Sequence, residues 1–423
     1  MEETKSMEPS QDASPMPNFE TEHQDQPPPS EFTSESVFAI VGASCVTFCT
    51  VGFINAFGVF QEYYEQVILS HESPSTIAWI GSFNIFCMFG GMMVAGMLEY
   101  KLGPTLLMII GGVITVFSLF MTSLCKEFYQ FFLAQGLVLG LGICLVLMPA
   151  FVTVTYYFRK SRGVAMGIVV AGSSLGGVIW PITLHKLIDE IGFGWSVRTA
   201  AFMMIPLLSL AVLTVRRPKN FVQPKQGRPD LSFLKNPIII LLSAGLFFIF
   251  LGLFSPFFYV TSWTTSLGHD PNLAFYMISV VNSASLFGRI IPGMVADKIG
   301  IYNVLVTISI FSGLIATCWT KATSVTGIII FSLAYGFSSG GVISLQAPCA
   351  AVLVAPSQYG VAMGFVMTTL SIAGLIGTPL NGQLLGAFGY LGISLFSGLA
   401  MILGSILIII ARLNLSKTIV AKL

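Results

Sequence analysis

The sequence predicts an all-α membrane protein with 12 transmembrane helices arranged as two six-helix bundles. Its composition is 54% hydrophobic and only 9% charged, whereas soluble domains carry about 25% charged residues. Its apolar residues fall into runs long enough to cross a bilayer, which takes about 20 residues. Short motifs also recur at an offset of 197 residues between the two halves of the chain. Because no run alternates with a period of two, helices rather than strands satisfy the backbone in the membrane.

The apolar runs form two groups of six, separated by a polar stretch. The first six cover residues 37–60, 77–98, 104–124, 128–155, 164–184 and 198–215. The second six cover residues 237–262, 273–296, 302–320, 324–350, 360–379 and 390–411. We therefore expect an N-terminal bundle over 37–215, a cytosolic linker over 216–236 and a C-terminal bundle over 237–412.

The ends of the chain are polar. Residues 1–36 carry nine acids, six prolines and one lysine, so we expect a disordered acidic cytosolic tail rather than a signal peptide. Residues 413–423 form a second cytosolic tail. The seven cysteines and four histidines show no ligand or disulfide spacing. The sequence therefore predicts no metal site, no cofactor and no nucleic-acid partner.

The distribution of positive charge predicts the orientation in the membrane. If the N-terminus is cytosolic, 15 lysines and arginines fall on the inner side and four on the outer side. An excess of positive charge marks cytoplasmic loops. We expect a multi-pass protein, in the plasma membrane, with both termini in the cytosol.

The repeat supports a transporter architecture. Gly163–Gly167 has the same five letters as Gly360–Gly364, and Gly96–Gly103 is similar to Gly293–Gly300, both at an offset of 197. Parallel repeats of this kind hold a substrate between the halves near the bilayer midplane. The alternative is a coincidence in a glycine-rich sequence.

One of these segments resembles a family signature. Gly293, Asp297, Lys298 and Gly300 resemble the loop motif of the major facilitator superfamily between helices eight and nine, and Tyr100 replaces the acid in the first copy. The resemblance implies a gate, in which the acid caps a helix N-terminus or pairs with an arginine in one conformation only. We expect the first gate to be weaker, or to use Glu99. The gating candidates are Asp297, Lys298, Gly293, Gly300, Lys101, Arg159 and Arg162.

A narrower resemblance covers nearly the whole chain from residue 37. Residues 157–167 and 171–176 look like the start of the fifth helix in the monocarboxylate transporter family, and 55–64 and 75–82 look like its fungal branch. Two features depart from the family. The acidic Asp-Gly-Gly motif is missing before the first helix, and Ser285 stands where animal carriers have an aspartate tied to proton coupling. Proton coupling therefore stays open.

Arg289 is the one charged residue deep inside a run. It lies eight residues before Asp297, about 12 Å along a helix. An intramembrane charge costs several kcal/mol unless it faces water or a partner, roughly +2.5 to +3.5 kcal/mol on insertion scales. Asn282 and Ser285 share its helical face. We expect a substrate-binding or gating role, and the alternative is a tether to backbone carbonyls of the other half.

Other polar residues within the runs complete the candidate substrate site. They are Asn55, Asn84, Gln346 and Tyr259. Each amide could equally hold neighbouring helices together, and the tyrosine could belong to an interfacial aromatic belt.

These features predict a transporter rather than an enzyme, because the sequence has no phosphate loop and no catalytic pair within a run. The resemblance implies secondary active or facilitative movement of a small organic solute by alternating access. Loss of the first-helix motif favours efflux of an organic secondary metabolite. An acidic metabolite is the more specific form of this prediction. The alternatives are import of a monocarboxylate or riboflavin-like nutrient, and a non-transporting membrane sensor. The expected partners are the solute, the lipid bilayer and, if transport is coupled, protons, with the protein acting as a monomer.

Overall fold

The computed structural model describes residues 31–219 and 231–416. The described residues form helices joined by short loops, with no strand among them. Most of the predicted N-terminal tail, the centre of the predicted linker and the end of the C-terminal tail lie outside the described residues.

The N-terminal half begins with a bent segment made of α1 (Ser34–Cys49), α2 (Val51–Ile54), α3 (Phe57–Tyr63) and the π-helix η1 (Tyr64–Ile68). The next segments are α4 (Pro74–Gly90) with α5 (Met92–Leu102), and α6 (Pro104–Thr122). The half ends with α7 (Phe128–Phe131), the π-helix η2 (Phe132–Val138), α8 (Leu139–Tyr157), α9 (Arg162–Ile191) and α10 (Phe193–Thr214).

The C-terminal half begins with the 3-10 turn η3 (Ser232–Lys235). Its first helices are α11 (Pro237–Ser266), α12 (Pro271–Ile299) and α13 (Ile301–Thr317). These are followed by η4 (Trp319–Lys321), α14 (Val325–Val352), η5 (Pro356–Gln358) and α15 (Tyr359–Leu415). Gly389 has a φ of 63° and divides α15 into two helices.

The fold class predicted from the sequence is confirmed. In the described part of the chain, nine helices are long and apolar enough to cross a membrane, counting α15 once. The pair α4–α5, bent by 41°, the 17-residue α13 and the break in α15 account for the other predicted spans. The first helix begins at Ser34, three residues before the predicted run, because Thr33 and Ser36 form a capping box there.

The repeat reappears as backbone geometry. Gly103 ends α5 with a φ of 81°, and Gly300, its equivalent 197 residues later, ends α12 with a φ of 101°. Only glycine adopts this conformation without strain. This requirement explains why both copies of the loop motif close on a glycine.

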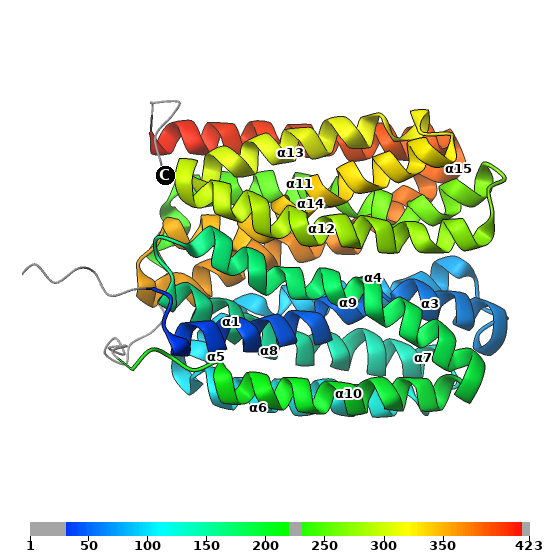
Figure 1. Cartoon of the computed structure of the whole chain (residues 1–423), viewed down its shortest axis with the longest axis horizontal. Helices are drawn as coiled ribbons and strands as arrows, with labels where there is room; N and C mark the ends of the chain where they lie inside the picture. The colour runs from blue at the N-terminus through cyan, green and yellow to red at the C-terminus, as the bar shows by residue number, and fades with distance from the viewer. Residues whose placement is uncertain (1–30, 220–230, 417–423) are drawn as a thin grey trace, which may run out of the picture. The chain divides into compact units, whose positions relative to one another are not determined.

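Figure 1 shows α1 to α10 on one side and α11 to α15 on the other, with the start of α1 and the end of α15 at the same end of the helices. The two halves meet along two sets of helices. In one set α9 packs against α12, and in the other α4 and α5 pack against the first part of α15. We call these the polar seam (α9 with α12) and the apolar seam (α4 and α5 with residues 359–388 of α15), for reasons given below.

Candidate functional site

The polar seam is a contact between two backbones. Gly163 of α9 packs on Gly293 of α12, and Gly167 packs on the carbonyl of Arg289. A Cβ on any of these three glycines would lie less than 3 Å from the facing carbonyl oxygen. Small residues at such positions let helices approach and slide.

The apolar seam repeats these contacts at the equivalent positions. Gly360 of α15 packs on Gly96, and Gly364 packs on the carbonyl of Met92. Each position differs from its partner in the polar seam by 197 residues. The repeated five-letter motif therefore lies where each half contacts the other.

The two seams differ sharply in chemistry. On α12 the polar seam carries Asn282, Ser285, Arg289 and Asp297, and on α9 the Ser173 hydroxyl faces Arg289. The equivalent residues of the apolar seam are Ile85, Met88, Met92 and Tyr100. Opening the polar seam exposes the charged groups of Arg289 and Asp297, which need water or a ligand. Opening the apolar seam exposes no charged group at the equivalent positions, although it breaks the hydrogen bonds of Thr368 with the backbone of Phe89 and Gly90.

Asp297 binds the N-terminus of α9 across the halves. Its Oδ1 accepts a hydrogen bond of 2.7 Å from the Gly163 N–H, and its Oδ2 accepts one of 2.8 Å from the Val164 N–H. The carboxylate satisfies two unpaired donors and faces the positive end of the helix dipole. Both interactions require the halves to be together at this end.

Arg162 and Tyr359 join the halves beside Asp297. The Arg162 guanidinium donates to the Tyr359 hydroxyl at 2.9 Å and lies 5.0 Å from the centre of its ring. The Tyr156 ring of the N-terminal half stacks on the Tyr359 ring, with 5.8 Å between ring centres. Arg162 was a gating candidate, but nothing in the sequence marked Tyr359 as its partner.

Arg289 is 2% exposed and reaches from α12 to α9. Its Nη1 donates to the Val170 carbonyl at 2.7 Å and to the Ser173 hydroxyl. Its Nε has no partner among the described residues. In this conformation Arg289 therefore makes the tether that the sequence left as the alternative to substrate binding.

Asn282, Ser285 and Asn55 lie along the same seam. Asn282 donates to the Ile278 carbonyl at 3.0 Å, but its Oδ1 and the Ser285 hydroxyl have no partner in the described part of the chain. A Cβ on Gly177 of α9 would lie 2.7 Å from Asn282 Oδ1 and 2.8 Å from Asn55 Nδ2. Asn282, Ser285 and Arg289 thus form a buried polar strip on α12, and the half-buried Asn55 lies beside Asn282.

The remaining substrate candidates lie elsewhere. Asn84 donates to the Gln135 carbonyl at 2.6 Å inside the N-terminal half, so it holds neighbouring helices together. Gln346 is buried in α14, and its Oε1 has no partner among the described residues. The Tyr259 hydroxyl of α11 lies 3.9 Å from the Cβ position of Gly382 on α15. In the described part of the chain, no hydrogen bond joins any of these three to the polar strip.

The other gating candidates separate into surface and backbone roles. Lys101, Lys298 and the Arg159 side chain are exposed. Gly300 supplies the turn after α12, and Gly293 the close backbone contact.

Glu99 corrects one hypothesis. It does not cap α15 as a substitute for the missing acid at Tyr100. Instead its 1%-exposed carboxylate forms an ion pair of 2.9 Å with Arg217, which also donates to the Glu99 carbonyl at 2.6 Å. Because Arg217 follows α10, this pair anchors the start of the linker to α5.

Glu31 contacts the loop before α9, and nothing in the sequence indicated this contact. Its carboxylate accepts hydrogen bonds of 2.9, 2.8 and 3.0 Å from the N–H groups of Arg159, Lys160 and Ser161. Burial by itself would raise the pKa of Glu31, but the three donors outweigh it and lower the pKa below its usual value of 4.5. Two carboxylates, Glu31 and Asp297, thus hold the start of α9.

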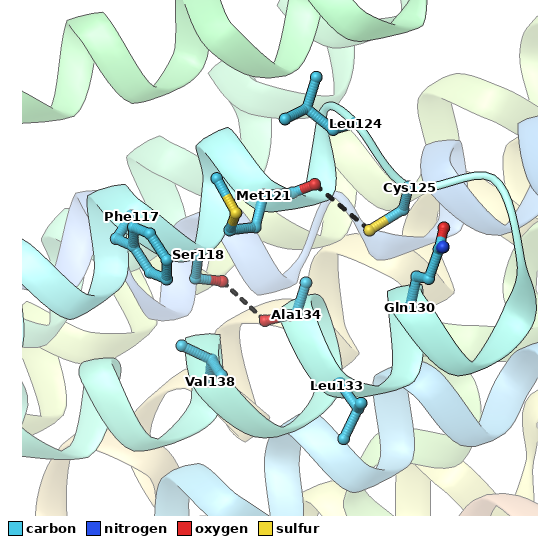
Figure 2. Close-up of a pocket in the computed structure, with 9 residues that line it drawn as sticks. All are labelled: Phe117, Ser118, Met121, Leu124, Cys125, Gln130, Leu133, Ala134 and Val138. Atoms are coloured by element: carbon cyan, nitrogen blue, oxygen red, sulfur yellow. Dashed lines mark hydrogen bonds between the residues drawn. The ribbon is translucent and has the colours of Figure 1, made fainter.

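One cavity lies within the N-terminal half, away from the contact between the halves. A pocket of about 370 Å³ lies between α6 and the segment α7–η2 of the N-terminal half, with Phe117, Leu124 and Leu133 exposed at its edge. Figure 2 shows Ser118 donating to the carbonyl of Ala134, at 2.7 Å. A second, narrow cavity does lie between the halves, lined by α4, α11 and α15.

The sequence is similar to those of known proteins over most of its length. The chain is 59% identical over 411 residues to the "Agnestins efflux protein AgnL12" of Paecilomyces divaricatus, covering 97% of this chain and 95% of that protein. It is 44% identical over 372 residues to the "Aspyridones efflux protein apdF" of Emericella nidulans, covering 87% of this chain and 75% of that protein.

Solved structures agree on the fold. The Escherichia coli fucose:proton symporter FucP superposes with a TM-score of 0.69 at 15% identity, covering 89% of this chain and 98% of that one. The human organic anion transporter MFSD10 gives 0.67 at 15% identity, covering 89% and 100%. Residues 38–378 match the Major Facilitator Superfamily. The chain belongs to the major facilitator superfamily and is similar to its fungal efflux transporters.

Proposed function

We propose that this protein exports a small organic secondary metabolite by alternating access. The observation that carries the proposal is the 59% identity, over 97% of the chain, to a protein named for the efflux of agnestins. The second relative, named for the efflux of aspyridones, supports the same direction of transport. Agnestins are therefore the first compounds to test.

The contacts at the start of α9 form the cytosolic gate. Asp297 and Tyr359 belong to the C-terminal half and bind Val164 and Arg162 of the N-terminal half. Opening the cytosolic side breaks these bonds, and closing restores them. A gate of this kind biases a two-state equilibrium without contacting the substrate.

Arg289 has a different task in each state. In the closed state the Val170 carbonyl and the Ser173 hydroxyl accept its hydrogen bonds. When α9 and α12 part, the guanidinium loses both partners and needs another acceptor. An anionic group of the substrate would supply two, in the paired geometry that arginine favours. Ser285, Asn282 and Asn55 would bind the remaining polar groups, with Asn84, Gln346 and Tyr259 as outlying candidates.

The remaining assignments follow from the residues. We place both termini and the linker in the cytosol, where 15 of the 20 basic residues then lie. The protein would act as a monomer in the plasma membrane. We assign it to the fungal branch of the monocarboxylate porter family, with proton coupling to be decided by experiment because Ser285 replaces the aspartate of that family.

Transport in both directions tests the proposal. Yeast cells that express the protein and are loaded with agnestins should release them faster than cells carrying the empty vector, and inside-out vesicles should accumulate them. Repeating the vesicle assay with and without a pH gradient tests proton coupling. Faster uptake of monocarboxylates or riboflavin by intact cells, without release of agnestins, would establish the import alternative and contradict efflux.

A further inference from the structure

The narrow cavity between α4, α11 and α15 lies on the contact of the two halves. Ile85 of α4 closes it from the N-terminal half, and the remaining lining comes from the C-terminal half. In this conformation it offers about 10 Å³ to the centres of water molecules, which is room for about one water. A ligand larger than water therefore fits only when the lining moves apart, as it does when Ile85 moves away with its half.

One wall of the cavity is aromatic. Phe250, Phe254 and Phe258 follow one another at four-residue intervals on one face of α11. Their ring centres are 5.5 Å apart for the first pair and 5.8 Å apart for the second. Aromatic faces and edges at such spacing accept a further ring in stacked or edge-to-face contact.

The opposite wall has no side chains at two positions. Gly374 and Gly377 of α15 line the cavity. A Cβ on Gly374 would lie 2.8 Å from Ile85 Cγ2, so that glycine is needed to close the halves. A Cβ on Gly377 would have its nearest neighbour at 3.5 Å, an ordinary contact. A methyl group at 377 is thus accommodated by the protein but takes space from the cavity.

Among the described residues of the lining, the single polar side chain is that of Asn381, which is 2% exposed. Its Nδ2 donates to the Ser255 hydroxyl at 2.9 Å, which fixes the amide, and its Oδ1 has no partner among the described residues. A buried acceptor without a donor costs about 1–3 kcal/mol. A ligand hydroxyl would remove that cost.

We propose that this cavity is a substrate subsite for an aromatic ring that bears a hydroxyl group. The ring packs between the α11 phenylalanines and the glycine face of α15, and the hydroxyl donates to Asn381 Oδ1. The subsite deepens the proposed efflux function and rests on it for its biological role. The subsite is lined by α4, α11 and α15, whereas the polar strip around Arg289 lies between α9 and α12. The substrate's aromatic ring and its other polar groups would therefore contact different helices.

Binding is tested with naphthol and its methyl ether, which lacks the donor and carries one extra methyl group, so Asn381→Leu is needed to separate the two effects. The purified full-length protein in nanodiscs is dialysed against each compound, with empty nanodiscs subtracted. The wild type should bind naphthol at least tenfold more tightly than the ether. Gly377→Ala should weaken naphthol binding at least tenfold. Gly386→Ala, on the same helix with nothing within 4 Å of its Cβ position, should bind as the wild type does.

Asn381→Leu separates the hydroxyl contact from the ring contact. It should bind naphthol and the ether about equally, because the acceptor is gone while the aromatic wall stays. Equal binding of both compounds by the wild type, or unchanged naphthol binding by Gly377→Ala, would overturn the subsite. Release of agnestins with no naphthol binding would refute the subsite alone, and the expected binding pattern without release would refute efflux alone.

Discussion

Arg162 and Tyr359 occupy equivalent positions in the two halves, 197 residues apart, and they bind each other. Each residue directly precedes one copy of the repeated five-letter motif. Their contact therefore marks the line about which the halves are related. It also shows how one position of a duplicated sequence has diverged into a complementary pair.

Loss of the Tyr359 hydroxyl should loosen the cytosolic gate. A hydrogen bond to a charged group is worth about 1.5–3 kcal/mol, so Tyr359→Phe should open this end about tenfold more often. The measurement is the labelling rate of a cysteine at Val361, which is 3% exposed. Tyr157→Phe is the matched control, because the Tyr157 hydroxyl bonds to Arg216 within the N-terminal half. Equal acceleration in both variants would mean that Tyr359 does not gate.

Asp297→Asn should slow transport more than it lowers the amount of protein in the membrane. The substitution removes the charge at the α9 N-terminus, worth about 0.3–1 kcal/mol, and replaces one of two acceptors with a donor. Export rate is compared with membrane level, and Asp270→Asn, at the start of α12, is the control. A parallel fall in level and export would assign Asp297 a structural role only.

Substitutions of Arg289 separate a tether from an anion site. Arg289→Lys removes the paired donors, so export of an acidic substrate should fall about tenfold or more, with little change for a neutral analogue. Arg289→Ala should enlarge the difference. Melting temperature is measured beside export. If both variants melt lower and lose all substrates equally, Arg289 is a tether in every state.

Glu31 should stabilise the start of α9 in a pH-dependent way. Because its folded pKa is lowered, its contribution is present above the unfolded value of about 4.5 and is lost as the pH falls through the lower folded value. Glu31→Gln should therefore cost about 1 kcal/mol or less at neutral pH. The difference should vanish in acid. Glu35→Gln, which breaks an exposed pair with Lys219, is the control and should change nothing.

Impermeant maleimide tests the orientation. In a cysteine-free background, which removes the exposed Cys318, a cysteine replacing exposed Leu231 in the linker should react in permeabilised cells and not in intact cells. A cysteine replacing Lys126, between α6 and α7, should react in intact cells. The reverse pattern would invert the assignment.

The sequence predicted the fold class because apolar length is a local property. It also predicted that Asp297 acts at a helix end, since the motif around it is contiguous. The partners could not be predicted. Glu31 binds residues about 130 positions away, and the separation between Glu99 and Arg217 is 118.

The polar and apolar seams could not be predicted from the sequence either. The repeat was visible, but which helices it brings together depends on how the halves pack. The subsite around Asn381 shows the same limit, because phenylalanines within a transmembrane helix look alike whether they face lipid or a cavity. Only the packing of α4 and α15 on α11 distinguishes them.

Alternating access requires the end of the polar seam at Asp297 to open and close during transport. Lys160 and Lys298 are exposed positions on opposite sides of the gate. Spin labels at these two positions, in a cysteine-free background, report the distance between them by double electron–electron resonance. We expect two distance populations, with the longer one enriched by Asp297→Asn and shifted by an exported substrate. A single short distance, unchanged by the variant and by substrate in a protein that still exports, would contradict it.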